Sequence, residues 1–374
     1  MWFSINLAVD HQGQPTITNG PDMDCVADKV RQIRELGLPT VHIISIGGWN
    51  APHPDTTNSP ETTYENWDHW NRHVAARPDV GFMGFDGFDW DIEGNDDPNN
   101  QYNHFTPQCL DTMGRFSQLA KERGNYIVSM APAESYLDPT YPTFDRSLLH
   151  AYPEWQPIIP DFDYHGRNTY AYLLARYGTF SSEAADAAAM SALQGEQGEQ
   201  GEQEKEKEGK QEKLELEQGR ECGVQMGRRA GDCLTFDFVT VQLYEGYSHA
   251  EYNITQLRTP PAQYLAQFAQ QMQAGWEVDF SDMAQFPVTR ITVPKTQLVV
   301  GLANGWAGDG KFLMLYPEEV AEGYKVLEEI GQEPRGFAFW NILDEGAASP
   351  RRPQEPVWMA KGLNRFLHTR EPEV

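Results

Sequence analysis

Cysteine is scarce in this chain of 374 residues, which contains only four: Cys25, Cys109, Cys222 and Cys233. Four cysteines are too few to build a disulfide scaffold at this length. None has a second cysteine at the close spacing that is typical of structural zinc sites, so no structural metal is expected. Cys222 and Cys233 are close enough in the sequence to bridge the end of a loop, but single buried thiols fit the sequence at least as well.

Long apolar runs and positive charge are scarce as well. No run approaches the roughly 18 apolar residues that a membrane-spanning helix needs. The 29 Lys and Arg against 55 Asp and Glu give a net charge of −26, which argues against a nucleic-acid partner. We interpret the acidic excess as a solvated surface. The first residues, MWFSINLAVDHQG, lack the basic start and apolar core of a signal peptide. The compartment stays open, and secretion is expected only if residues are missing from the N-terminus.

Seven short runs rich in β-branched and aromatic residues are predicted to be strands. They cover 2–9, 40–48, 80–94, 125–134, 236–246, 297–306 and 335–346. Amphipathic stretches at 24–36, 110–123, 261–274 and 318–328 are predicted to be helices. Strands that alternate with helices indicate βαβ units and a parallel sheet. Polar side chains gather at the ends of these runs, on the face where barrel enzymes place their active sites.

This pattern favours an α/β fold, a single (β/α)8 TIM-type barrel over 1–374. Because only seven strands are visible, the first barrel strand is expected to be missing. Truncation at the N-terminus is favoured over a misassigned start codon or an incomplete barrel. An unclosed barrel would expose two strand edges. The segment at about 194–221 consists almost entirely of Gly, Glu, Gln and Lys. It cannot offset the entropy of ordering, so we expect a disordered insert between the fifth and sixth barrel strands.

The octet DGFDWDIE at 86–93 carries the clearest chemical signal. Alternate side chains of a strand share one face, so Asp89, Asp91 and Glu93 are expected to line up. Three carboxylates repel one another at low dielectric, so at least one should hold a proton near neutral pH. A carboxyl group that keeps its proton is what a general acid requires. Glu93, nearest the end of the strand, is best placed to reach a substrate.

The octet also has other interpretations. It imitates the opening of an EF-hand calcium loop, but that motif needs Glu at its twelfth position, which is Asn100 here, and helices on both sides. The preceding run VGFMGF indicates a strand instead. A metal site of another kind stays open, and a purely structural triplet is opposed by the cost of unpaired buried carboxylates. The sequence therefore favours catalysis without a metal or cofactor.

The octet also resembles the D-G-x-D-x-D-x-E signature on the fourth barrel strand of glycoside hydrolase family 18, the chitinase-like enzymes. Further motifs occur in the order of that family. SIGG (45–48) resembles its third-strand S-x-G-G, MAP (130–132) its fifth strand, QLY (242–244) its sixth and FW (339–340) its eighth. The resemblance runs from about Trp2 to Phe366, apart from the insert, and the first strand of the family has no counterpart.

This resemblance implies a retaining chitinase of β-1,4-linked N-acetylglucosamine polymers or oligomers, in which the acetamide of the substrate is the nucleophile. Glu93 would be the acid and base, Asp91 would hold the acetamide N–H, and Asp89 would share a proton with Asp91. Tyr244 would orient the acetamide carbonyl. The substrate-binding residues would be Trp340, as the apolar floor under the sugar, with Gln242, Met130, Trp49 and Gly48.

Each supporting residue also has a plainer interpretation. Tyr244 and Trp340 could be packing residues of the barrel, and the glycines of SIGG could serve close backbone approach. Three more cleft candidates are Trp306, Glu134 and Glu345.

Glu245 stands where the family usually has Asn, so the substrate preference stays open. The alternatives are an endo-β-N-acetylglucosaminidase that acts on N-glycans and a catalytically silent chitin-binding lectin. In each case a monomer with a carbohydrate partner is expected.

Overall fold

The computed structural model describes residues 1–94, 100–139, 168–181, 232–246, 248–281, 286–307, 312–349 and 351–367. The predicted insert at about 194–221 and Cys222 lie outside these residues. Cys233 is disulfide-bonded, whereas Cys25 and Cys109 are free. Within the described residues, no helix is both long and apolar enough to cross a membrane.

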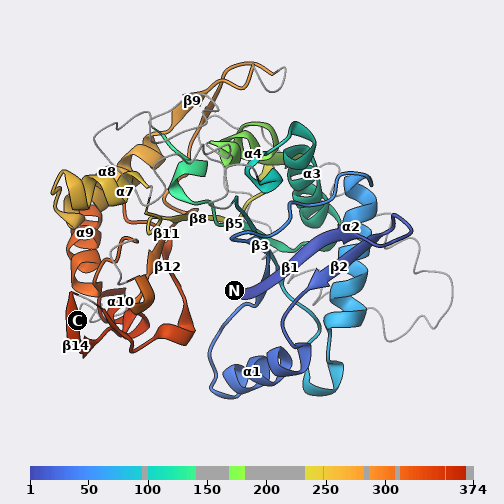
Figure 1. The fold of residues 1–374 in the computed structure, drawn as a ribbon, viewed down its shortest axis with the longest axis horizontal. Coiled ribbons are helices and arrows are strands. Elements are labelled where there is room, and N and C mark those ends of the chain that lie inside the picture. Colours follow the sequence, from blue (N-terminus) through green and yellow to red (C-terminus); the bar gives the residue numbers. More distant parts are fainter. Residues whose placement is uncertain are drawn as a thin grey trace, which may run out of the picture.

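An eight-stranded sheet lies at the centre of the molecule (Figure 1), in the order β12-β11-β8-β5-β4-β3-β1-β2. Its strands are β1 (Trp2–Val9), β2 (Pro15–Asn19), β3 (Ile43–Gly48), β4 (Gly87–Ile92), β5 (Ile127–Met130), β8 (Phe238–Gln242), β11 (Leu298–Ala303) and β12 (Gly336–Trp340). The pairing of β2 with β1 is antiparallel and all the others are parallel. The mostly parallel α/β sheet predicted from the sequence is confirmed.

All seven predicted strands are present, and all but β1 are shorter than the runs predicted for them. The run 80–94 contains only the six residues of β4, and the prediction that VGFMGF is a strand was wrong. The chain turns before β4 at Gly81 and Gly84, whose φ angles are +79° and +105°. These are left-handed conformations, which a strand does not contain and which glycine adopts at little cost.

No closed barrel is detected among the described residues, because β12 and β2 stand at opposite ends of the strand order. The β1–β2 hairpin was not predicted. Asp10 stabilises its turn by accepting hydrogen bonds from the N–H groups of Gln12 and Gln14, at 2.8 and 2.9 Å. Strand β12 at one end of the sheet nevertheless contacts β1, the strand next to the other end. The rings of Phe3 on β1 and Trp340 on β12 lie 4.1 Å apart between centroids.

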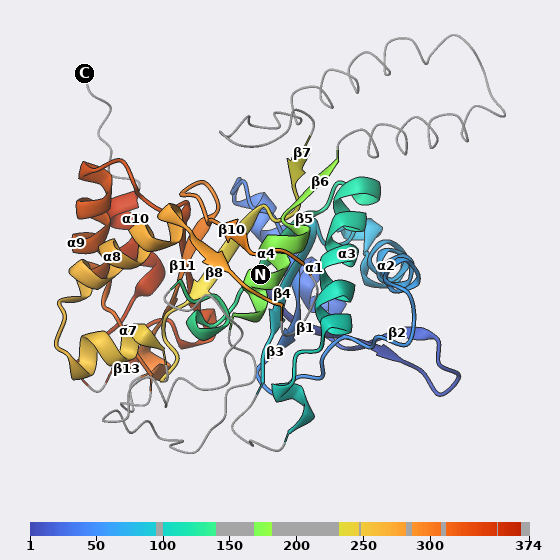
Figure 2. The same cartoon turned by 90° about the horizontal axis from the view of Figure 1, so that it is seen from above.

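Helices flank the sheet on both sides. Figure 2 shows α2 and α3 grouped at one side of the strands and α8, α9 and α10 at the other. The four predicted helices are confirmed as α1 (Met23–Glu35), α3 (Pro107–Gly124), α8 (Pro261–Ala274) and α9 (Pro317–Glu329). The sequence analysis missed α2 (Pro60–His69), α4 (Thr169–Tyr177), α7 (His249–Glu251) and α10 (Met359–Leu367).

Smaller elements connect this framework. Two-stranded ribbons form from β6 (Thr179–Ser181) and β7 (Asp232–Leu234), from β9 (Trp276–Val278) and β10 (Thr289–Ile291), and from β13 (Ala348–Ser349) and β14 (Arg352–Pro356). Short helical turns are η1 (Trp70–Ala75), η2 (Pro78–Val80), η3 (Gln101–Asn103), η4 (Glu134–Tyr136), η6 (Tyr252–Gln256), η7 (Gly305–Ala307) and η8 (Ile342–Asp344).

The core determines which face of β4 carries the polar side chains. Phe88 and Trp90 are fully buried and pack against Phe116 of α3, with ring centroids 5.1 and 5.4 Å from it. Trp90 also donates from Nε1 to Ser117 Oγ of α3 at 2.8 Å. Fully burying one such side chain stabilises the fold by roughly 1.5–3 kcal/mol. Because side chains alternate along a strand, the odd-numbered residues of β4 face away from the helix.

Candidate active site

Three carboxyl groups line one side of β4 and the residue that follows it. Asp89 is 0% exposed, Asp91 2% and Glu93 5%. Exposure therefore rises toward the C-terminal end of the strand. The structure brings together the three side chains that the sequence analysis singled out, with Glu93 outermost.

Asp89 is the deepest of the three. Its Oδ1 accepts a hydrogen bond from the Ser129 hydroxyl on the neighbouring strand β5, and its Oδ2 has no hydrogen-bond partner. Burial, followed by repulsion from Asp91, raises the pKa of Asp89 to about 8. Asp89 therefore carries a proton at neutral pH, as expected for a charge held away from water.

Asp91 and Glu93 form a hydrogen-bonded pair. Burial raises the pKa of Asp91 to about 7, while hydrogen bonds from Glu93 and Gln242 oppose this rise. The pKa of Glu93 lies well above its ordinary value, first because of burial and then because of the negative charges of Asp91 and Glu245. Burial and these neighbouring charges therefore favour the protonated form of Glu93 beside Asp91. This is the protonation pattern that a general acid needs.

Gln242 fixes the orientation of Asp91. It is the last residue of β8, and its Nε2 donates to Asp91 Oδ1 at 2.8 Å and to the Ala131 carbonyl at 2.6 Å. The sequence analysis expected Gln242 to bind substrate. In this structure the amide contacts the carboxyl pair and the end of β5, and binding of substrate by Gln242 stays a prediction.

Tyr244 lies just beyond β8, with its ring 5.8 Å from that of Trp306. Burial raises the pKa of its hydroxyl well above 10, and the charges of Glu245 and Glu93 add to this. The phenol therefore stays protonated and available as a donor close to the carboxyl groups. Glu245 is itself buried, at 6% exposure, so the site contains a fourth carboxyl group.

Two glycines of β3 let the backbone approach the carboxyl groups. Gly47 and Gly48 have φ angles of +105° and +110°. A Cβ atom on Gly47 would lie 2.6 Å from the Asp91 carbonyl oxygen, and one on Gly48 would lie 3.3 Å from the Phe3 ring and 3.9 Å from Asp91 Oδ2. Gly48 therefore lies between Asp91 and the ring of Phe3.

Phe3 and Trp340 form an aromatic pair beside the carboxyl groups. Trp340 is 36% exposed and Trp49, which follows β3, is 44% exposed, so both have surface available to a ligand. Phe3 was missed by the sequence analysis. Its position in an apolar strand gave no signal that distinguished it from a core residue.

The remaining candidates are packed or hydrogen-bonded within the protein. Met130, expected to bind substrate, is fully buried in the core. Glu345 accepts hydrogen bonds from the N–H groups of Met359 and Ala360 at 2.8 and 2.6 Å, and so caps the start of α10. Glu134 is 2% exposed and accepts hydrogen bonds from the Tyr264 hydroxyl and, at 2.9 Å, from the Ala250 N–H.

Other residues around β4 were also missed. Ser129 contacts Asp89, His53 lies 3.3 Å from the Glu93 carbonyl oxygen through its Nε2, and Tyr136 and Tyr170 bond the backbone of β4 and its continuation. No local pattern in the sequence marks any of them. Within the part of the chain that the structure describes, no group of three His, Cys, Asp or Glu side chains could hold a metal ion.

No known family profile matches this chain, and no curated protein matches it. Similar solved structures are known. They include a family GH18 chitinase from Chromobacterium violaceum, with a TM-score of 0.48 and 13% identity over 91% of this chain and 70% of that one. The Legionella pneumophila ChiA C-terminal domain has a TM-score of 0.44 and 13% identity over 98% and 86% of the two chains. A GH18 chitinase from Pseudoalteromonas aurantia has a TM-score of 0.42 and 13% identity, over 90% of this chain and 81% of that one. At these identities and TM-scores the similarity assigns neither family nor activity.

Proposed function

We propose that this protein is a retaining glycoside hydrolase that cleaves β-1,4-linked N-acetylglucosamine polymers or oligomers by substrate-assisted catalysis. The observation that carries the proposal is the buried line of Asp89, Asp91 and Glu93 at the end of β4, with Glu93 outermost and its pKa raised by burial and by Asp91. Glu93 is the outermost acid, and Asp91 lies beside it as an acceptor. This arrangement suits a reaction in which one protein carboxyl group transfers the proton and the substrate supplies the nucleophile.

In the first step, Glu93 gives its proton to the glycosidic oxygen as the bond to the anomeric carbon breaks. The acetamide carbonyl oxygen of the same sugar forms a bond to that carbon and produces a cyclic oxazolinium ion. Asp91 accepts a hydrogen bond from the acetamide N–H and stabilises the positive charge, which is worth more in a buried site than in water. The leaving chain departs with the proton from Glu93.

In the second step, the Glu93 carboxylate removes a proton from water, and the water oxygen attacks the anomeric carbon. The oxazolinium ring opens, the acetamide is restored, and Glu93 is protonated again. Two displacements at one carbon retain the β-configuration. Tyr244 would donate to the acetamide oxygen and orient it for attack, and Trp340 with Phe3 would support the apolar face of the sugar.

The deciding experiment is incubation of the purified protein with N-acetylglucosamine tetramer and pentamer, with products and anomers followed by NMR. We expect initial β-anomer. Glu93→Gln should reduce kcat by about 10²–10⁴-fold, because general acid–base catalysis contributes that much. Glu61→Gln on the outer helix α2 is the matched control, since its carboxyl pairs with Arg115 rather than with the β4 cluster. It should retain activity.

Three results would contradict the proposal. Initial α-anomer would exclude retention. Binding of the oligomers without cleavage by a folded protein would favour the lectin, and cleavage confined to N-glycans would favour an endo-β-N-acetylglucosaminidase.

A further inference from the structure

Strands β4 and β5 separate just before Glu93, the proposed catalytic acid. Their register ends at Trp90 and Met130, and the last bond across the pair runs from the Ala131 N–H to the Trp90 carbonyl at 2.7 Å. In a continuing parallel ladder the next bond would join the Ile92 N–H to the Ala131 carbonyl. Here the Ala131 carbonyl accepts from Gln242 Nε2 instead, at 2.6 Å. The β5-facing backbone of Ile92 therefore needs another partner.

The hydroxyl of Tyr170, from α4, is that partner. It accepts from the Ile92 N–H at 2.7 Å and lies 3.1 Å from the Ile92 carbonyl oxygen, to which it donates. A phenol has one donor and can also accept, so a single hydroxyl satisfies both backbone groups. The Trp90 carbonyl oxygen is farther away, at 3.4 Å. Tyr170 thus takes the place of the missing neighbouring strand.

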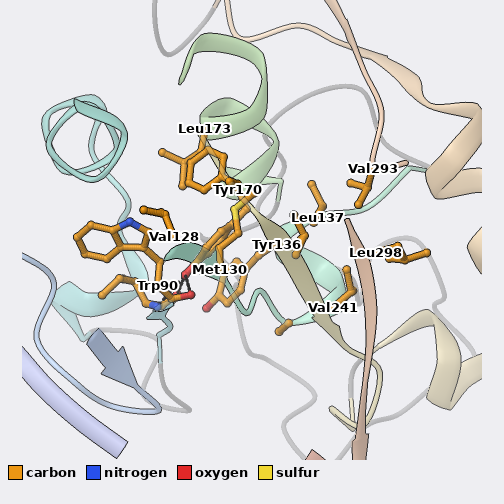
Figure 3. Packing of buried hydrophobic residues seen from close by; sticks show 14 of the residues in the cluster. Trp90, Val128, Met130, Tyr136, Leu137, Tyr170, Leu173, Val241, Val293 and Leu298 are labelled. Carbon is orange, nitrogen blue, oxygen red and sulfur yellow. Dashed lines mark hydrogen bonds between the residues drawn. The ribbon is translucent and has the colours of Figure 1, made fainter. Parts of the chain in front are cut away.

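A second phenol acts one residue beyond the acid. The Tyr136 hydroxyl, from η4, accepts from the Gly94 N–H at 2.8 Å. Tyr136 and Tyr170 are 1% and 0% exposed, and their ring centroids are 6.0 Å apart. Figure 3 shows both rings beside Trp90 within the packed core. Dense packing leaves neither hydroxyl free to move away from the backbone.

The two phenols therefore bracket Glu93. Tyr170 holds the peptide before it, and Tyr136 holds the peptide after it. The opposite side of this second peptide is held as well, because His53 Nε2 lies 3.3 Å from the Glu93 carbonyl oxygen. With both flanking peptides fixed, the direction in which the Glu93 side chain leaves the backbone is fixed too.

We propose that Tyr136 and Tyr170 are positioning residues that hold the Glu93 carboxyl against Asp91 through hydrogen bonds to the flanking backbone. This inference rests on the proposed function for its catalytic consequence. Neither hydroxyl contacts the substrate; each acts through the peptide groups next to the acid. A displacement of about 1 Å in a reacting group can cost about 10²-fold in rate, so the loss of either bond should affect turnover more than binding.

The kinetic test compares Tyr170→Phe and Tyr136→Phe with Tyr172→Phe. Tyr172 lies on the same helix as Tyr170, but its hydroxyl bonds Asp111 of α3 at 2.7 Å, away from β4. We expect kcat of the first two variants to fall about 10–100-fold with KM changed less than about threefold, and kcat of the control to change less than about twofold.

A second measurement does not depend on turnover. The protein is labelled with ¹³C at the Glu carboxyl carbons, and the Glu93 signal is assigned by its loss in Glu93→Gln. In Tyr170→Phe and Tyr136→Phe the titration midpoint of Glu93 should move toward the ordinary range for Glu, because the carboxyl is no longer held against Asp91. In Tyr172→Phe the midpoint should stay where it is in the unmodified protein.

The outcomes separate this inference from the proposed function. If the unmodified protein hydrolyses no oligomer, the proposed function fails, and the titration alone decides whether the phenols position Glu93. If kcat and the Glu93 titration in both phenol variants match those of Tyr172→Phe, the inference is overturned. If Tyr170→Phe does not fold, Tyr136→Phe decides, because it removes the bond to Gly94 and leaves those of Tyr170 to Ile92 in place.

Discussion

Asp89 shows how burial alone can change the chemistry of one residue. Its carboxyl has no exposed surface, receives a single hydrogen bond from Ser129 and lies beside another acid. Water would stabilise the charged form, and the interior does not. The proton therefore stays on Asp89 until about pH 8. An exposed Asp, in contrast, loses its proton near pH 4.

This proton makes stability depend on pH. Between about pH 4 and 8 the folded state binds a proton at Asp89 that the unfolded state has lost. The stabilising contribution is therefore complete below about pH 4 and declines as pH rises to about 8, by at most about 1.4 kcal/mol per pH unit. Asp89→Asn should flatten this decline in urea denaturation curves measured from pH 4 to 8. An unchanged slope would contradict the assignment.

Gly47 is a residue at which any side chain should disrupt the site. Its φ of +105° is strained for other residues, and an added Cβ would lie 2.6 Å from the Asp91 carbonyl oxygen. We expect Gly47→Ala to lower the free energy of unfolding by about 2 kcal/mol or more. The matched control is Gly336→Ala on β12, where an added Cβ meets no atom within 4 Å. Equal denaturation midpoints for the two variants would refute the expectation.

At the scale of elements, Glu134 joins a turn that follows β5 to two helices that follow β8. It belongs to η4 after β5, and its carboxyl is bonded by Tyr264 of α8 and by the Ala250 N–H of α7. His249 of α7 in turn lies 3.3 Å from Asp138, which follows η4. Because η4 also carries Tyr136, this buried network supports the segment that holds Gly94.

Removing one of these bonds should be costly. Tyr264→Phe leaves a buried carboxyl oxygen without its hydroxyl donor, and we expect a loss of about 1–3 kcal/mol in the free energy of unfolding. Tyr126→Phe is the comparison, because its acceptor Asp68 is 26% exposed and also pairs with Arg72. It should cost less than about 1 kcal/mol. A smaller loss for Tyr264→Phe than for Tyr126→Phe would count against the network.

At the scale of the whole molecule, the sheet is open in its strand order yet joined through side chains. The contact between Phe3 and Trp340 links its two sides at the end where the carboxyl groups lie. The aromatic floor of the proposed site is therefore built by residues more than 300 positions apart, one from each side of the opening.

The net charge of −26 also acts on the whole molecule. Like charges repel across the folded surface, and salt screens them. At pH 8 we expect Tm to rise by a few degrees between about 20 mM and about 500 mM NaCl. Near pH 4.7, the isoelectric point of the sequence, the repulsion between like charges largely vanishes. The rise of Tm with salt should therefore vanish there too. A fall in Tm with salt at pH 8 would show that attractive ion pairs dominate instead.

Much of the framework could be predicted from local patterns. The strands were found because buried parallel strands are runs of β-branched and aromatic residues, and the strand register then brings Ser45 opposite Asp89. The hairpin strand β2 was missed because PTITN is short and half exposed. Helix α4 was missed because nine residues are too few for a clear helical period.

The sequence by itself determined the alternation of strands and helices and the alignment of Asp89, Asp91 and Glu93, because both follow from the periodicity of a strand. Only the tertiary structure decided what surrounds them: the phenols of Tyr136 and Tyr170, the amide of Gln242 and the ring of Phe3. The hydrogen bonds of the phenols and the amide join residues between 42 and 151 positions apart. Burial and packing bring them together, and no local pattern in a sequence records which distant side chain will meet a given backbone group.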